Sequence, residues 1–240
     1  MLNALRNFLN KPDIELGPPA PDTPFIAIGD IHGRADLLTR LLPRLPNFPI
    51  ICVGDYVDRG DHSAEVLRLL LERPDIICLS GNHEDMMLNF IDAPEQEGRW
   101  LLHGGMQTIA SFGLGGISPS ARGEELVRLR DLFVKTMGDE MLNWLRDLPT
   151  LWQSGNVAVL HAGADPSKPI ADQKPQTLRW GHPAFLSTPR TDGMWVVHGH
   201  TVVDAAIAEG GRIAIDTGAY ATDCLTAAII EPGQVRFETA

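Results

Sequence analysis

Short apolar runs alternate with helical patterns over the first hundred residues of the chain. The runs FIAI, IICV and IICL begin at residues 25, 50 and 76, and each is followed by a stretch with apolar side chains three or four positions apart. Leu37, Leu38 and Leu41 form such a stripe after the first run. Strands buried on both faces read as continuous apolar runs, so this alternation predicts an α/β fold with parallel strands.

The middle of the chain, about residues 92 to 150, has a mostly helical pattern. We expect it to be a helical insertion that covers one end of the sheet. Its break, FGLGGISPS, follows no strand and opens no clear helix, so we interpret it as a plain loop and not as a phosphate-binding loop.

Strand patterns return after residue 156, in the runs NVAVLHAG, MWVVHGH, GRIAIDTG, CLTAAII and QVRFET. Gly210-Gly211 and Pro232-Gly233 predict tight turns, and therefore antiparallel pairing, between the last of them. We expect one domain over residues 23–240, preceded by an arm over residues 1–22. Leu2, Leu5 and Phe8 have helical spacing, which predicts a short helix in that arm.

Composition narrows the set of partners. The chain has 240 residues and a net charge of −11, which disfavours nucleic acid or an anionic membrane because both require a basic surface. No apolar stretch approaches the roughly 20 residues that cross a bilayer. Cys52, Cys78 and Cys224 lie in apolar runs, so we expect reduced, buried thiols and a cytoplasmic protein.

Metal-binding side chains follow almost every apolar run. Five of the eight histidines lie at these strand ends, together with aspartates and one asparagine, in the segments GDIHG, GDYVDRG, GNHE, HAG and HGHT. Ligands gather at the carboxyl ends of strands in open α/β sheets. Mixed oxygen and imidazole ligands suit Mn, Fe or Zn, and six or more of them indicate two metals that share a carboxylate such as Asp55.

These five motifs occur in an order that resembles the phosphoprotein phosphatase family of calcineurin-like metallophosphoesterases, especially its small bacterial and phage serine/threonine phosphatases. WLLHGGMQTIASFG and IDTGAY are also similar to stretches of those enzymes. The resemblance implies a sandwich of two mixed β-sheets flanked by helices.

The resemblance also implies two metal sites, for which Mn is the expected ion and Fe or Zn the alternatives. The first would be formed by Asp30, His32 and Asp55. The second would be formed by Asp55, Asn82, His161 and His200. We prefer His200 to His198 because it is the histidine of the GHT motif.

The same resemblance implies catalytic roles. Two divalent ions lower the pKa of a shared water, and the resulting hydroxide is expected to attack phosphorus. His83 is the expected general acid, with Asp58 as its partner, while Arg59 and Asn82 bind phosphate.

The resemblance further implies a second phosphate-binding arginine after a tryptophan, but LRWGHP has His182 in its place. Arg179 or Arg190 could substitute, and the sequence does not decide between them. Asp216 and Tyr220 fit either the pocket or the packed strand ends.

Three functions remain open at this point. The first is a serine/threonine protein phosphatase, which acts on a phosphorylated protein or a small phosphoester. The second is a diadenosine tetraphosphate hydrolase, in which we expect a different residue before Arg59. The third is a noncatalytic metal-binding scaffold, which would not need His83 and Asp58 beside the metal ligands. The Asp58-Arg59 pair favours the first. The oligomeric state is not determined by the sequence.

Overall fold

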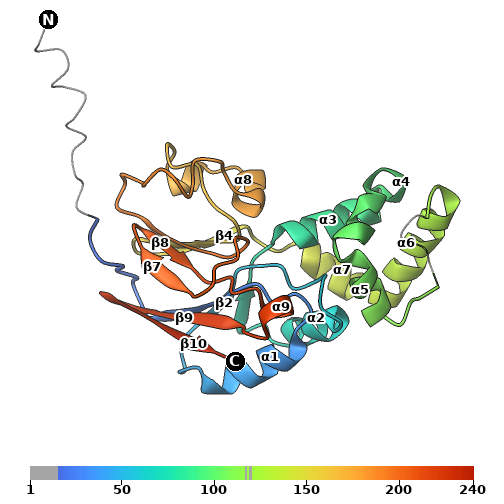
Figure 1. Cartoon of the computed structure of the whole chain (residues 1–240), viewed down its shortest axis with the longest axis horizontal. Coiled ribbons are helices and arrows are strands. Elements are labelled where there is room, and N and C mark those ends of the chain that lie inside the picture. Colours follow the sequence, from blue (N-terminus) through green and yellow to red (C-terminus); the bar gives the residue numbers. More distant parts are fainter. Residues whose placement is uncertain (1–15, 117, 119–120) are drawn as a thin grey trace, which may run out of the picture.

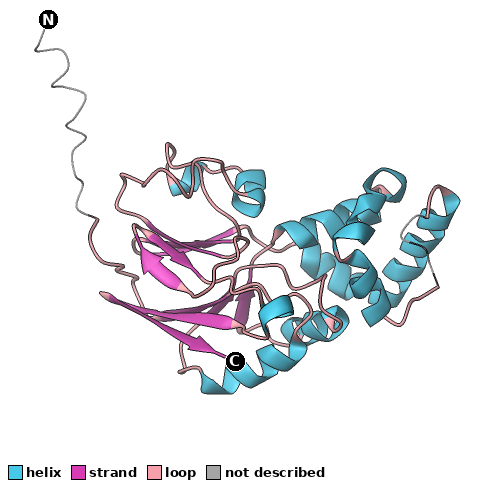
Figure 2. Ribbon diagram, viewed as in Figure 1, coloured by secondary structure: helices cyan, strands magenta, loops and turns pink. Residues whose placement is uncertain are grey.

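A computed structural model describes residues 16–116, 118 and 121–240 of the chain. Two five-stranded mixed sheets face each other, with helices on their outer sides and a group of helices beyond one end (Figures 1 and 2). The helix expected near residues 2 to 9 lies outside the described residues.

The first sheet has the strand order β10-β9-β1-β2-β3. Strands β1, β2 and β3 are parallel to one another, with β1 in the centre of the sheet and β3 at one edge. On the other side of β1, β9 pairs antiparallel with β1, and β10 pairs antiparallel with β9. Their bounds are Phe25–Ile28 (β1), Ile50–Cys52 (β2), Ile76–Cys78 (β3), Thr226–Glu231 (β9) and Gln234–Thr239 (β10).

The second sheet has the strand order β4-β5-β6-β8-β7. Strands β5, β6 and β8 are parallel, and the two edge strands are antiparallel to their neighbours. The bounds are Leu151–Ser154 (β4), Val157–Leu160 (β5), Trp195–His198 (β6), Ile207–Glu209 (β7) and Arg212–Ala214 (β8).

Alternating residues of the central strands supply different cores. Phe25 and Ala27 of β1 point between the sheets, where they pack with Val157 and Val159 of β5. The intervening Ile26 and Ile28 point to the outer face, under the helices. Both faces of β1 are therefore buried, which explains its uninterrupted apolar run.

Helices cover the sheets in three places. Helices α1 and α2 lie on the outer face of the first sheet, α8 lies beside the second sheet, and α3 to α7 form the helical group (Figure 1). The α-helices span Ala35–Leu41 (α1), Ser63–Leu71 (α2), Asn82–Asp92 (α3), Pro94–Glu97 (α4), Gly105–Ser111 (α5), Glu124–Met137 (α6), Asp139–Arg146 (α7), Pro175–Trp180 (α8) and Ala219–Thr222 (α9). The 3₁₀-helices span Leu42–Arg44 (η2), Gly98–His103 (η3) and Ile170–Asp172 (η4).

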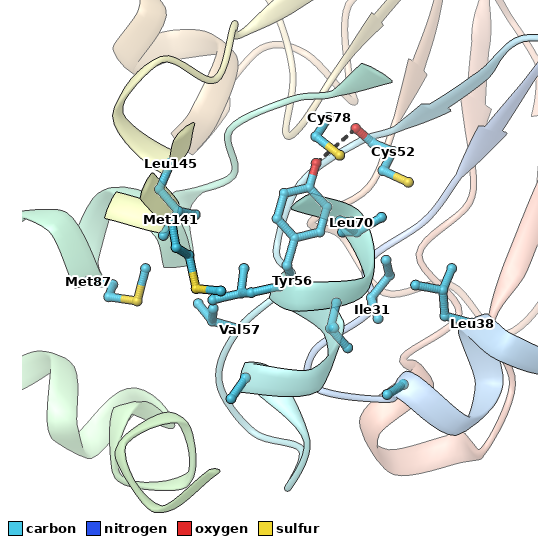
Figure 3. Close-up of a cluster of buried hydrophobic side chains, with 14 of the residues drawn as sticks. Ile31, Leu38, Cys52, Tyr56, Val57, Leu70, Cys78, Met87, Met141 and Leu145 are labelled. Carbon is cyan, nitrogen blue, oxygen red and sulfur yellow. Dashed lines mark hydrogen bonds between the residues drawn. The ribbon is translucent and has the colours of Figure 1, made fainter. Parts of the chain in front are cut away.

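Tyr56 anchors the GDYVDRG loop in the core. Its ring packs among Ile31, Leu70 and Met141, between α2 and α7 (Figure 3). Its buried hydroxyl donates to the carbonyl of Leu79 at 2.7 Å, and lies 3.2 Å from that of Cys52. The charged residues of this loop are thus fixed to the ends of β2 and β3, unlike those of a free surface turn.

The predicted fold class is confirmed, since two mixed sheets are flanked by helices in an α/β arrangement. Strands β4 and β7 were not predicted, because both are short edge strands with exposed residues and no apolar run. The helical pattern of the middle region is present as α4 to α7, and the two predicted tight turns join β7 to β8 and β9 to β10.

The three cysteines are free; Cys52 and Cys78 are buried as expected, whereas Cys224, which precedes β9, is only half-buried. Within the described residues, no helix is both long enough and apolar enough to cross a membrane.

Candidate active site

The polar residues that follow the apolar runs meet at one end of the two sheets. The loops after β1, β2 and β3 bring residues from the first sheet, and those after β5 and β6 bring residues from the second. The carboxyl ends of parallel strands share one edge, which is why residues far apart in sequence converge. The site is built from Asp30, His32, Asp55, Asp58, Arg59, Asn82, His83, His161 and His200.

The backbone is strained at this site. Six non-glycine residues in the described part of the chain have positive φ, and five of them belong to the site: His32, Asp55, Asp58, Arg59 and His200. Left-handed backbone costs a non-glycine residue roughly 1–3 kcal/mol and persists only where the surroundings enforce it. Such clustering is typical of a site whose side chains must point in one direction.

His32 presents an unpaired nitrogen to Asp55. Its Nδ1 donates to the carbonyl of Val57 at 2.8 Å, so the neutral ring carries its lone pair on Nε2. That Nε2 is buried without a hydrogen-bond partner and lies 3.5 Å from Asp55 Oδ2. Burial lowers the pKa of His32 to about 3, so the ring is neutral. A cation between the lone pair and the carboxylate would satisfy both.

His161 and His200 converge on Asn82 in the same way. His161 Nε2 lies 2.8 Å and His200 Nδ1 lies 2.7 Å from Asn82 Oδ1. His161 Nδ1 lies 3.2 Å from the carbonyl of Val53, so a proton on Nδ1 directs the lone pair of Nε2 toward the amide oxygen of Asn82. Burial lowers the pKa of His200 to about 4. This pocket also suits a cation.

Buried carboxylates gather beside these rings. Burial, with Asp216 and Asp55 nearby, raises the pKa of Asp30 well above its usual range. Asp30 accepts the backbone N–H of His200 at 3.0 Å. Burial acts to raise the pKa of Asp55 as well, but His161, His83 and His32 outweigh it and lower that pKa. A concentration of buried negative charge and neutral imidazoles fits divalent cations.

The described residues therefore fit two cations on either side of Asp55. One group of potential ligand atoms comprises His32, Asp55 and His83, and another comprises Asp55, His161 and His200. His83 lies within reach, but its two nitrogens are already engaged by Asp58 and Arg59. Asp30 and Asn82 complete the sets implied by the sequence motifs, and their assignment as ligands stays a prediction.

The backbone of Gly81 packs closely against the carboxylate of Asp55. Gly81 has no side chain, and a Cβ there would lie 2.2 Å from Asp55 Oδ1. The backbone N–H of His83 donates to the same oxygen at 3.0 Å. Asn82 and His83 form the first turn of α3, an 11-residue helix whose N-terminal dipole end favours negative charge in the site.

His83 and Asp58 form a buried pair. His83 Nδ1 donates to Asp58 Oδ2 at 2.6 Å, and both side chains are almost fully buried. Burial acts to lower the pKa of His83, but the carboxylates of Asp55 and Asp58 outweigh it and raise that pKa. A histidine with a raised pKa can hold a proton near neutral pH and give it to a developing oxyanion.

Arg59 lies next to this pair. Its Nη2 is 3.1 Å from His83 Nε2, the nitrogen that faces away from Asp58. The ring of Tyr220 lies under the guanidinium, 4.7 Å from Cζ. Arg59 therefore has a planar support on one face and free donors on its edge, which suits a phosphate group.

Glu84 holds the GDYVDRG loop in place, and its role was not recognised from the sequence. Its carboxylate accepts the backbone N–H groups of Asp55, Tyr56 and Gly81 at 2.8–2.9 Å. The signal was present, because Glu84 is the last residue of GNHE and lies at the third position of α3. A buried carboxylate at that position aligns the loop that carries Asp55 with the helix that carries Asn82.

The three residues considered for a second phosphate contact, Arg179, Arg190 and His182, differ from one another in their surroundings. Arg179 pairs with Asp85 at 3.0 Å, and its Nε is buried without a partner. Arg190 pairs with Asp192. His182 is part of a cavity of about 320 Å³ that His200 also lines. Their proposed contacts with substrate stay predictions.

The remaining histidines lie apart from these groups. His198 is buried, with its Nδ1 3.0 Å from the carbonyl of Gly199 and its ring edge-to-face with Phe185. His62 directly precedes α2, and His103 ends η3. None of the three belongs to a group of potential metal ligands within the described chain.

Comparisons with known proteins define the class. The model of the calcineurin-like phosphoesterase family matches residues 23–204. The chain belongs to this family, and it is a metal-dependent phosphoester hydrolase whose family binds two divalent metals. No curated protein matches the chain significantly in sequence.

Solved structures share its fold. A putative diadenosine tetraphosphatase is 21% identical, with a TM-score of 0.65, over 92% of this chain and 96% of that one. A cold-active protein-tyrosine phosphatase of a psychrophilic Shewanella is 16% identical, with a TM-score of 0.61, over 90% and 80%. A Saccharomyces cerevisiae protein serine/threonine phosphatase with similarity to human PP5 is 17% identical, with a TM-score of 0.51, over 91% and 80%. At these sequence identities the three structures share the fold of this chain.

Proposed function

We propose that this protein is a serine/threonine protein phosphatase that uses two divalent metal ions, with Mn as the preferred metal. The observation that carries this proposal is the group formed by Asp58, His83 and Arg59, which combines a proton donor, its carboxylate and a phosphate-binding guanidinium within hydrogen-bond distance. The mixed imidazole and oxygen ligands support Mn, with Fe or Zn as alternatives.

The metal ions would be held by Asp30, His32 and Asp55 on one side and by Asp55, Asn82, His161 and His200 on the other. When bound, such ions supply Lewis acidity and activate water for attack.

His83 would protonate the leaving group. As the bond between phosphorus and the ester oxygen breaks, that oxygen keeps the electron pair and takes the proton from His83 Nε2, so that a neutral alcohol leaves. Asp58 fixes the ring through Nδ1 and stabilises its charged form. Serine and threonine are alkoxide leaving groups, which need this proton more than aryl oxides do.

Arg59 would bind the phosphate oxygens. Its Nη2 lies beside His83 Nε2. A bound phosphate would accept a charge-assisted hydrogen bond from Arg59 and would draw the guanidinium away from His83. That displacement frees Nε2 to carry the proton. Tyr220 supports the guanidinium on its face in this arrangement.

The charges around the site favour a single phosphate over a polyphosphate. Arg34 is engaged by Asp36 and Asp223, Arg179 by Asp85 and Arg190 by Asp192. Arg59 has no carboxylate partner among the described residues. A diadenosine tetraphosphate carries several negative charges, and several unpaired cations would be needed to bind them.

The test is a direct comparison of substrates. Purified protein with Mn²⁺ is offered phosphoserine, phosphothreonine and phosphotyrosine peptides and, separately, diadenosine tetraphosphate. We expect the highest kcat/KM for the first two. A higher value for diadenosine tetraphosphate would replace this proposal with the second function, and a preference for phosphotyrosine would reject serine/threonine specificity.

We further propose a reducing compartment such as the cytoplasm, which the three free cysteines support. A non-reducing gel, run on protein taken directly from cells, tests this assignment by showing whether the cysteines have been oxidised to disulfides.

A further inference from the structure

The helical group reaches the catalytic pair through two side chains. Trp100 lies in η3 and Thr108 in α5, and both are buried against the GDYVDRG loop. Trp100 Nε1 donates to Asp58 Oδ2 at 2.8 Å, and Thr108 Oγ1 donates to Asp58 Oδ1 at 2.6 Å. Together with His83, these two donors use both carboxylate oxygens of Asp58.

Thr108 also holds the backbone of Asp58. The N–H of Asp58 donates to Thr108 Oγ1 at 2.8 Å, so a single hydroxyl contacts both the main chain and the carboxylate. Ser63 Oγ lies 3.3 Å from the same hydroxyl. Asp58 has a positive φ, and these contacts fix a backbone that an aspartate does not favour.

The approach of the helical group depends on a glycine. Gly104 has φ +110°, and a Cβ there would lie 2.6 Å from the backbone nitrogen of Arg59 and 2.8 Å from Asp58 Cβ. The turn between η3 and α5 therefore packs directly on the backbone of the two catalytic residues. A larger residue would separate Trp100 and Thr108 from Asp58.

Trp100 is itself held rigidly. Its ring packs against Phe90 at 5.1 Å and Phe133 at 5.9 Å between centroids, so the indole connects α3 and α6. Its N–H points at Asp58 out of an apolar cluster. A buried indole N–H needs an acceptor, and here that acceptor is the carboxylate that also holds the ring of His83.

We propose that Trp100 and Thr108 are positioning residues through which the helical group orients Asp58 and, through it, the proton donor His83. They do not touch the substrate. This inference rests on the proposed role of His83 as general acid, and not on the identity of the substrate. It gives the middle region of the chain a function in the leaving-group step.

The proposal predicts a dependence on the leaving group. A well-oriented acid matters most for esters whose leaving group is strongly basic, such as phenyl or alkyl phosphates, and least for p-nitrophenyl phosphate. Trp100→Phe removes the donor and keeps most of the ring. We expect about tenfold lower kcat for phenyl phosphate, the effect of one hydrogen bond to a charged group, and much less change for p-nitrophenyl phosphate.

A second pair of variants keeps the test independent of folding. Thr108→Val keeps the shape and loses the hydroxyl, whereas Thr108→Ser keeps the hydroxyl. We expect Thr108→Val to steepen the dependence of kcat on leaving-group pKa. Thr108→Ser should show the same dependence as the unmodified protein. Trp195→Phe and Thr136→Val are the matched controls, since the indole N–H of Trp195 donates to the carbonyl of Gly17 and the hydroxyl of Thr136 bonds within its own helix.

His83→Asn separates the possible failures. A steeper dependence in His83→Asn, with uniform losses across all esters in Trp100→Phe and Thr108→Val, would overturn the positioning role and leave the general acid intact. An unchanged dependence in His83→Asn would overturn both. If the protein hydrolyses aryl phosphates but no phosphopeptide, the proposed substrate is wrong. The leaving-group test with aryl phosphates still decides whether Trp100 and Thr108 are positioning residues.

Discussion

Nδ1 of His83 donates to Oδ2 of Asp58 at 2.6 Å, in a contact from which solvent is excluded on both sides. The two residues come from different motifs, and the carboxylate of Asp58 fixes the ring in one tautomer by accepting the proton of Nδ1. The opposite nitrogen, Nε2, faces the guanidinium of Arg59 at 3.1 Å and the carboxylate of Asp55 at 3.9 Å.

Replacement of His83 by Asn tests the general acid. Asparagine is close in size but cannot deliver a proton, so we expect kcat for a phosphoserine peptide to fall about 10²- to 10⁴-fold. Metal content, measured by elemental analysis, should stay near that of the unmodified protein. A loss of metal equal to the loss of activity would show that His83 acts as a ligand instead.

Asp58→Asn tests how the pKa of His83 is set. Asp58 raises that pKa in the folded protein, so its neutralisation should lower it. Activity that needs protonated His83 is lost as pH rises through this pKa, and the alkaline limb of the kcat profile should therefore move to lower pH. The profile is measured with an alkyl phosphate. A limb that stays in place would assign it to another group.

Much of the site could be predicted from the sequence because its residues occur in short local motifs at strand ends. GDIHG, GDYVDRG and GNHE each place a candidate metal ligand directly after a buried strand, and parallel pairing brings these residues together. Local patterns also predict the main strands and most of the helical middle region.

The rest depended on long-range packing. The contacts of Trp100 and Thr108 with Asp58 span 42 and 50 residues, and no periodicity indicates which helix docks on which loop. The short edge strands β4 and β7 lack an apolar run of their own. Likewise, the pairing of Arg179 with Asp85 follows from the way α8 meets α3.

The choice between His200 and His198 can be decided by metal counting. His200→Gln removes a neutral ring that contacts Asn82 in the pocket, so we expect about one metal ion fewer per chain. His198→Gln is the matched control, since His198 is buried beside Phe185 and should affect stability more than metal content. The reverse pattern, with metal lost only in His198→Gln, would contradict the assignment.

Glu84→Gln tests the anchor of the GDYVDRG loop. The carboxylate accepts backbone N–H groups on both oxygens, and the amide group of glutamine would face donors with a donor. We expect a loss of about 3 kcal/mol in the free energy of unfolding, measured by urea denaturation. Exposed Glu140 in α7 provides the control Glu140→Gln, for which we expect a change within about 0.5 kcal/mol. Equal effects of the two changes would rule out the anchoring role.

Tyr220 provides a test of how Arg59 is held. Its ring lies 4.7 Å from Arg59 Cζ and packs edge-to-face with His32 at 5.4 Å between centroids. Tyr220→Phe keeps the aromatic face, so we expect little change, whereas Tyr220→Leu removes the cation–π contact. A loss of about 1 kcal/mol corresponds to about fivefold weaker competitive inhibition by inorganic phosphate. If Tyr220→Phe weakens inhibition as much as Tyr220→Leu does, the hydroxyl and not the ring is what matters, and support of the guanidinium by the aromatic face is wrong.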